Sequence, residues 1–230
     1  MQTFVALFLA AALGLFWAYG FKRKHKETAQ EPTRLFSDVR PLLSNSKISA
    51  TGAAGVHTLS GYYKGRFFQL KVIAENLAAR KLPGLWLMVT RPEAQPVTQV
   101  IDIMMRPTGP VSFSNFDLLD HALPLPPGFP AHAIARSDQA VMREPWDVIR
   151  RQMRHLHDPR GKELLVSPKG VRLVTLLAEA DRAGYGVFRQ ADFGRPVVTA
   201  GLALELFAAL SELEDDLARE HSEAKNHGKA

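Results

Sequence analysis

The first 21 residues form the longest apolar run of the chain. Residues 1–21 contain no Asp, Glu, Lys, Arg or His, and residues 3–21 are almost entirely apolar. Nineteen residues in a helix span roughly 28 Å, about the thickness of a bilayer's hydrocarbon core. Trp17 and Tyr19 lie near the end of the run, where aromatic rings prefer the headgroup level. The pattern predicts a transmembrane helix over 1–21 that contacts the lipid bilayer through residues 3–21.

A basic block follows this run immediately and predicts its orientation. Positive charges flanking a span stay in the cytoplasm, so the N-terminus is expected outside and the remainder inside. The alternative is a cleaved signal peptide with Ala18 and Gly20 at the cleavage site. It is opposed by the lack of a basic segment before the run, by the length of the run and by the side on which the charges lie. The residues expected to contact lipid or a partner here are Lys22, Arg23, Lys24 and Lys26.

Polar residues dominate the segment after the basic block, and from residue 56 apolar and polar residues alternate along the chain. Residues 22–55 are predicted to be a basic flank and a solvated linker with one short apolar patch at Leu35, Phe36, Leu42 and Leu43. Docking of Leu42 and Leu43 on the domain or on the membrane surface is the alternative. From residue 56 to about 105 the pattern has the period of two that is typical of half-buried strands. Lys64-Gly65 predicts a hairpin turn. Short connections favour antiparallel pairing of the strands expected at 56–63, 66–74, 85–89 and 97–105.

The second half mixes helical and strand patterns. Six prolines predict an irregular connection over 107–130. Apolar residues spaced three and four apart predict a helix over about 144–157 with a stripe made by Trp146, Ile149, Met153 and Leu156. Strands are expected at 162–166, 171–177 and 185–191, although the pattern of 171–182 also fits a helix. Thr199 is expected to cap a helix that extends to about residue 219 and carries a leucine stripe.

Together these elements predict the α+β class: one transmembrane helix followed by a domain with an antiparallel sheet and two or more helices. The domain is expected over 56–220, with sub-halves 56–106 and 131–220 as an alternative division, and 221–230 as a disordered tail.

Composition narrows the function classes. The 230 residues include no cysteine, which excludes thiol nucleophiles, disulfides and Cys-ligated metals. The net charge of +6 first suggests an acidic partner such as nucleic acid. Residues 1–26 hold four bases and no acid, however, so the rest of the chain carries only 25 bases against 23 acids. The excess positive charge therefore lies mainly beside the predicted span and indicates its orientation in the membrane. No specific nucleic-acid binding is expected.

Candidate catalytic groups are sparse. Asp117, His121 and His132 combine carboxylate and imidazole groups and make a hydrolase an alternative function. The stretch 116–120 fits a short helical turn with exposed carboxylates better. No phosphate-binding loop, dinucleotide fingerprint, HExxH or nucleophile elbow occurs in the sequence. We therefore expect no cofactor and favour a non-enzymatic function, with the hydrolase as an open alternative.

Two clusters near residue 155 contain residue types that are typical of binding sites. His155, His157 and Asp158 resemble a metal cluster, but residues two apart on a helix project about 200° apart, so no metal is predicted. Arg150, Arg151 and Arg154 share a helix face that fits anionic lipid headgroups, or a solvated face partly paired with Asp147 and Asp158.

The function predicted from these patterns is a single-pass, membrane-anchored protein with a cytoplasmic partner-binding domain, such as an accessory or assembly factor of a membrane complex. The partner is a protein of unknown identity. The alternatives are the membrane-surface hydrolase and an anionic-lipid binder.

Overall fold

The computed structural model describes residues 32–51, 56–75, 82–107, 111–142, 146–182 and 191–227. The predicted transmembrane helix, its basic flank and most of the strand expected at 185–191 lie outside the described residues. Within the described ranges, none of the helices has the length and apolar character needed to span a membrane.

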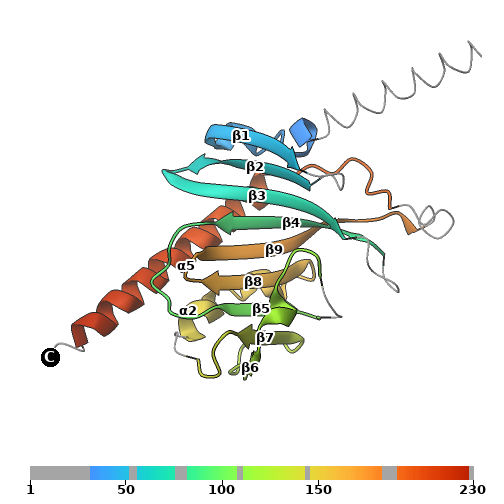
Figure 1. Ribbon diagram of the computed structural model, residues 1–230. Helices are drawn as coiled ribbons and strands as arrows, with labels where there is room; N and C mark the ends of the chain where they lie inside the picture. The colour runs from blue at the N-terminus through green and yellow to red at the C-terminus, as the bar shows by residue number, and fades with distance from the viewer. Residues whose placement is uncertain are drawn as a thin grey trace, which may run out of the picture.

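Nine antiparallel strands form one sheet in the order β1-β2-β3-β4-β9-β8-β5-β7-β6, which shows the predicted α+β class (Figure 1). The strands are β1 (Ser44–Thr51), β2 (Val56–Tyr63), β3 (Arg66–Glu75), β4 (Gly84–Arg91), β5 (Ile101–Met105), β6 (His121–Leu123), β7 (Ala133–Ser137), β8 (Gly161–Ser167) and β9 (Gly170–Glu179). The helices are α2 (Trp146–Arg151), α3 (Arg154–His157) and α5 (Ala200–His227), with 3-10 turns η1 (Arg40–Leu42) and η2 (Phe116–Leu118).

The β2–β3 hairpin confirms the strongest local prediction. Its turn residues Lys64 and Gly65 have φ of 48° and 77°, the left-handed conformation that such two-residue turns need. On β3, Phe68, Leu70 and Val72 are buried beneath the helices, while the alternate side chains face the other way. The period of two in the sequence therefore fixed the register of this pair.

The sheet does not divide into the expected sub-halves. Residues 170–179 are a strand, which settles the ambiguity of 171–182, and this strand pairs with β4 on one side and β8 on the other. β5 lies beyond β8, so strands from both halves interleave. β4 is apolar on both faces and needs a neighbour along each edge, which β3 and β9 supply. The division into 56–106 and 131–220 is therefore corrected to one sheet.

The domain begins earlier than predicted. Leu35, Phe36 and Val39 are buried in the core, and the amide of Val198 donates to the carbonyl of Leu35 at 2.8 Å. Leu43 is also buried, and residues 44–51 form the edge strand β1. Residues 32–51 thus belong to the domain, which corrects this part of the expected linker over 22–55. The apolar spacing of 35, 36 and 39 forms one face of a turn, and that face packs into the core.

The C-terminal helix is longer than predicted. The Thr199 hydroxyl accepts a hydrogen bond from the amide of Leu202 at 3.3 Å, as expected of the cap. Leu206, Leu210, Leu213 and Leu217 are buried, which confirms the stripe. α5 continues through His227, so residues 221–227 of the expected disordered tail are helical. This last part contains no Gly or Pro to end the helix, and its side chains are exposed.

The helix expected over 144–157 is interrupted. Among the described residues, α2 ends at Arg151 and α3 begins at Arg154, with a turn between them. Ile149, Met153 and Leu156 are nevertheless all buried, so the predicted apolar stripe is confirmed across the break.

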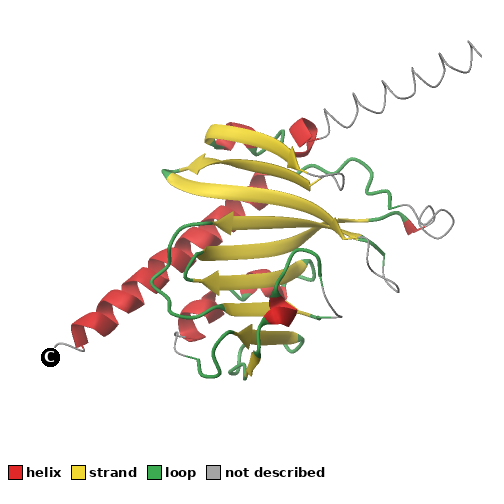
Figure 2. Cartoon of the chain, in the orientation of Figure 1, coloured by secondary structure: helices red, strands yellow, loops and turns green. Residues whose placement is uncertain are grey.

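The sheet has two unlike faces. α5, α2 and α3 cover one face, and the main core lies between them and the strands (Figure 2). On the other face, residues 111–119, which we call the strap, cross β4, β9, β8 and β5. No described helix covers this second face over β1–β3 (Figure 1). We call this uncovered part the open face.

Gly170, at the start of β9, permits a close approach between two backbone segments. Its φ is +146°, and a Cβ at this position overlaps the carbonyl oxygen of Arg91. We expect Gly170→Ala to lower the free energy of unfolding by about 2 kcal/mol because the backbone is strained and the strand must shift. Urea unfolding of the full chain in mild detergent, followed by tryptophan fluorescence, measures this. Gly65→Ala is the control: its φ is +77° but its added Cβ meets no atom within 4 Å, so a loss of about 1 kcal/mol is expected. Equal losses in both variants contradict the packing argument.

Candidate functional site

Two central strands place a buried carboxyl pair on the face opposite α5. Asp102 on β5 is 1% exposed and Glu163 on β8 is 0% exposed. Asp102 lies opposite Leu165, and Glu163 lies opposite Met104, so the two carboxyls are diagonal neighbours on the same face. This register brings two acidic side chains together away from water.

Arg172 and Ser114 complete the cluster. Arg172 on β9 also lies opposite Leu165, and its Nη2 is 2.7 Å from Oε1 of Glu163. The Ser114 hydroxyl, on the strap, lies 2.6 Å from the same Glu163 oxygen and 3.2 Å from Oδ2 of Asp102. The amide of Phe116 donates to Ser114 Oγ at 3.1 Å. The strap is thereby connected to both carboxyls through one side chain.

The cluster is neutral when it holds one extra proton. Two carboxylates and one guanidinium carry a net charge of −1, and protonating Asp102 removes it. Burial, followed by the Glu163 charge and a hydrogen bond with Glu163, holds the pKa of Asp102 well above its usual range, and Arg172 and Ser114 act in the opposite direction. Oδ1 of Asp102 and Oε2 of Glu163 have no other partner among the described residues. A carboxylic acid bonded to a carboxylate therefore accounts for this geometry.

Apolar contacts hold the strap on either side of Ser114. Phe113 packs against Trp86 with ring centroids 5.6 Å apart, and both border a small cluster with Met88 and Val174. The Arg136 guanidinium lies over the ring of Phe116 at 5.5 Å and donates to strap carbonyls. The strap is thus a packed part of the fold rather than a loose connection.

The open face has a different character. Tyr62 is 42% exposed and makes an edge contact with Phe67, with ring centroids 5.2 Å apart. Their neighbours on the same face are partly or fully exposed polar side chains, namely Lys47, Ser60, Gln69 and Lys71. Aromatic rings among hydroxyl, amide and amine groups are typical of protein-binding surfaces.

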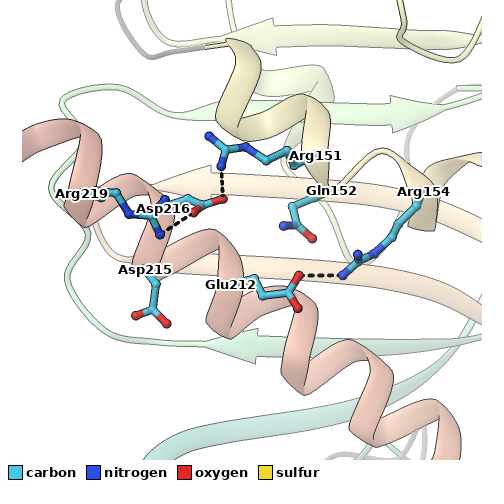
Figure 3. Close-up of a pocket in the computed structure, with 7 residues that line it drawn as sticks. All are labelled: Arg151, Gln152, Arg154, Glu212, Asp215, Asp216 and Arg219. Atoms are coloured by element: carbon cyan, nitrogen blue, oxygen red, sulfur yellow. Dashed lines mark hydrogen bonds and ion pairs between the residues drawn. The ribbon is translucent and has the colours of Figure 1, made fainter.

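A charged cavity of about 440 Å³ lies on the opposite side of the molecule, between α5 and the α2–α3 turn (Figure 3). Asp216 is held between Arg151, at 3.1 Å, and Arg219, at 3.0 Å. Glu212 pairs with Arg154 at 2.7 Å. Five of the seven lining residues therefore bind one another, and these ion pairs fasten α5 to α2 and α3.

These ion pairs change the character of the predicted basic face. Arg150 pairs with Asp147 at 2.6 Å, as one of the two interpretations expected. Arg151 and Arg154 pair with acids of α5, while Asp158 pairs with Arg160. The positive charges that made the face suitable for anionic lipid are thus compensated within the domain.

The three predicted catalytic candidates lie apart. His121 begins β6 opposite Ser137, whereas His132 precedes Ala133 at the other end of β7. Five strand residues separate these ends by about 16 Å. Asp117 is exposed on η2, which confirms the predicted short helical turn. His121 and His132 therefore cannot act on one substrate atom together, and the cavity between α5 and the α2–α3 turn is lined by none of the three candidates.

The metal candidates are occupied by other interactions. Nε2 of His155 accepts a hydrogen bond from Nε of Arg154 at 3.1 Å, and Nδ1 faces Glu205 at 3.3 Å. Burial and then the Arg154 charge lower the pKa of His155, so the ring is neutral at pH 7. Hydrogen bonds from Arg160 lower the pKa of Asp158, and His157 is exposed. No group of three suitable ligands occurs within the described residues.

Sequence reasoning missed the carboxyl pair. The available signal was a charged residue at an alternating position inside an apolar strand, because Asp102 lies between Ile101 and Ile103. Glu163 similarly precedes two leucines. These positions indicate side chains on the second face of the sheet, but the covering strap could not be anticipated from them.

The fold and the site define an α+β protein with a single antiparallel sheet, one helix-covered face and a second face that is partly strapped and partly open. No family model matches the chain, and no curated protein matches it. Among solved structures, the chain is similar to the mycobacterial trehalose monomycolate transport factor A, TtfA, with a TM-score of 0.42 and 10% sequence identity. The match covers 82% of this chain and 93% of that chain.

Proposed function

We propose that the protein is a membrane-anchored, non-enzymatic accessory protein whose domain binds a protein partner through the open face. The observation that carries the proposal is the contrast between the two faces of the sheet. Helices pack on one face, which carries the main core, while the other presents Tyr62 and Phe67 among polar side chains over β1–β3. The compensated charges of Arg150, Arg151 and Arg154 favour this surface over a lipid-binding helix face.

The anchor and its orientation are part of the same proposal. Residues 3–21 span the bilayer, and the basic flank, with Lys22 and Lys26 at its ends, remains in the cytoplasm. The described part of the domain starts at residue 32, so ten residues (22–31), a reach of at most about 35 Å, separate it from the predicted span. This short separation favours a partner that is itself in the membrane or bound to its cytoplasmic surface.

Photo-crosslinking in native membranes tests the surface. A photoreactive amino acid replaces Tyr62 on the open face or, as a control, Ala208, which is exposed on α5. We expect one discrete adduct with another protein from position 62 and none from position 208. Equal adducts from both positions, or none from either, contradict the proposal.

A charge substitution tests the same surface through affinity. Tyr62→Arg is expected to reduce the companion that co-purifies in mild detergent at least tenfold, because it places an unmatched charge in the centre of the contact. Ala208→Arg adds the same charge on α5 and is expected to leave the companion in place. Quantitative mass spectrometry of both purifications gives the ratio. A monomer without a reproducible companion in either variant and in the wild type contradicts a partner-binding function.

A further inference from the structure

We infer that the strap is a pH-sensitive latch, which Ser114 holds against the sheet while Asp102 and Glu163 share one proton, and which opens when that proton is lost. Opening uncovers the apolar side chains of Trp86, Met88 and Val174 beside the open face. The latch depends on the carboxyl pair and not on the partner proposed above.

Hydrogen-bond stoichiometry supports a proton in the closed state. The Ser114 hydroxyl has one hydrogen and two carboxyl neighbours, at 2.6 Å and 3.2 Å. The hydroxyl can donate its hydrogen to only one of these two oxygens at a time, so the other carboxyl oxygen faces lone pairs of the hydroxyl. This contact is favourable when Asp102 is protonated and donates, or when its proton lies between the carboxyls and reduces its charge. It is repulsive when both carboxyls are ionised.

Charge balance supports the same state. The charged groups on the elements around the pair are Arg172 of β9, Lys162 of β8, Arg136 of β7 and Asp117 of the strap. Lys162 donates to the carbonyls of Met105 and Arg106, at 3.0 Å and 3.3 Å. Arg136 donates to strap carbonyls, and Asp117 is exposed. β4 contributes uncharged side chains to this face. Arg172 pairs with Glu163 at 2.7 Å, and one guanidinium neutralises only one of the two carboxylates.

The pH at which the strap opens depends on which of its two states binds the proton of Asp102 more tightly. Burial and Glu163 raise the pKa of Asp102 in the closed state, so the closed strap binds the proton more tightly than the open one. The closed state is fully favoured below the ordinary Asp pKa of about 3.9. As the pH rises from there through the raised pKa, the ratio of closed to open strap falls up to tenfold per pH unit.

Deprotonation acts on the strap directly because Ser114 links the two. Its oxygen also accepts the amide of Phe116, so a displaced Ser114 loses that bond as well. The remaining contacts are the packing of Phe113 on Trp86 and the Arg136 bonds to the carbonyls of Asp117 and Leu119. These contacts and the buried rings of Phe113 and Phe116 do not involve the carboxyl pair, so its charge acts on the strap only through Ser114 and leaves the sheet folded.

Amide hydrogen exchange of the full chain in mild detergent, measured by mass spectrometry over pH 4–9 and corrected for intrinsic rates, tests the latch. In the wild type, protection of residues 114–119 is expected to fall with rising pH, by up to tenfold per unit. Asp102→Asn carries a neutral donor in place of the acid, so its strap is expected to stay protected at all pH values. Ser114→Ala is expected to reduce strap protection throughout. Amides of the β2–β3 hairpin report whether each variant is folded.

Three outcomes overturn the latch. The first is strap protection in the wild type that is as independent of pH as in Asp102→Asn. The second is an Asp102→Asn variant that keeps the wild-type pH dependence. If Asp102→Asn does not fold, the test uses Ser114→Ala instead. The third outcome that overturns the latch is strap protection in Ser114→Ala with the same pH dependence as in the wild type. Loss of the partner through Tyr62→Arg leaves all these profiles unchanged, so failure of the latch and failure of the proposed function are distinguishable.

Discussion

Glu214→Ala is expected to lower the free energy of unfolding by about 3–5 kcal/mol, because it removes the carboxylate that binds the buried Arg91 guanidinium through two hydrogen bonds. Among the described residues, the guanidinium then keeps only one backbone carbonyl at 2.9 Å and the exposed carboxylate of Glu93 at 3.4 Å. Arg91 on β4 is 5% exposed, and its Nε and Nη2 donate to the two Glu214 oxygens at 2.8 Å and 3.0 Å. Gln95 donates to the same carboxylate at 2.7 Å, and Arg66 approaches it at 3.4 Å. One carboxylate on α5 thus binds three side chains of the sheet and its loops.

The neighbouring Glu212 provides the matched control. It lies two residues earlier on α5 and pairs with Arg154, but both side chains are more than half exposed. Exposed pairs contribute about 0–1 kcal/mol, so Glu212→Ala is expected to cost little. Urea unfolding of both variants in the full chain measures the difference. Losses of similar size in the two variants contradict the role of burial.

Local patterns in the sequence predicted the elements that depend on near neighbours. The hairpin at Lys64-Gly65, the leucine stripe of α5 and the apolar stripe around Ile149 all follow from spacing within about ten residues. Each of these features has an apolar face whose period is visible in the chain. Such patterns specify what an element buries, and in this protein they did so correctly.

Pairing between distant segments could not be predicted in this way. β9 inserts beside β4 although about 80 residues separate them, and β5 pairs with β7 and β8. The alternation of apolar and polar residues predicts which side chains of a strand share a face. It does not predict which other strand pairs with it. β1 was missed for a related reason: its sequence is polar because it is an edge strand, and polar edges resemble linkers.

The carboxyl pair shows the same limit at the level of a site. Asp102 and Glu163 are about 60 residues apart, and only the β5–β8 register makes them neighbours. The residues that the sequence suggested for chemistry, His121 and His132, are close along the chain but lie at opposite ends of β7. Proximity in sequence was a poor guide, because in an antiparallel sheet a site is assembled across strands.

The attachment of α5 to the sheet also depends on aromatic packing, which Phe207→Ala tests. Phe207 is fully buried, and its ring lies 4.3 Å from that of Phe68 and 5.3 Å from that of Tyr63. Truncation leaves a cavity between α5 and β3, so we expect the free energy of unfolding to fall by about 3–5 kcal/mol. Urea unfolding with near-UV circular dichroism measures this loss.

Phe67→Ala is the matched control on the other face of the same strand. Phe67 is half-buried and contacts Tyr62 at its edge, so its removal is expected to cost about 1 kcal/mol. The two variants should separate stability from binding. Phe207→Ala loses stability yet keeps the partner at temperatures where it is folded, whereas Phe67→Ala stays folded and loses the partner. If Phe67→Ala retains the partner at wild-type levels, the open face is not the binding surface, because its two aromatic side chains are then not at the contact.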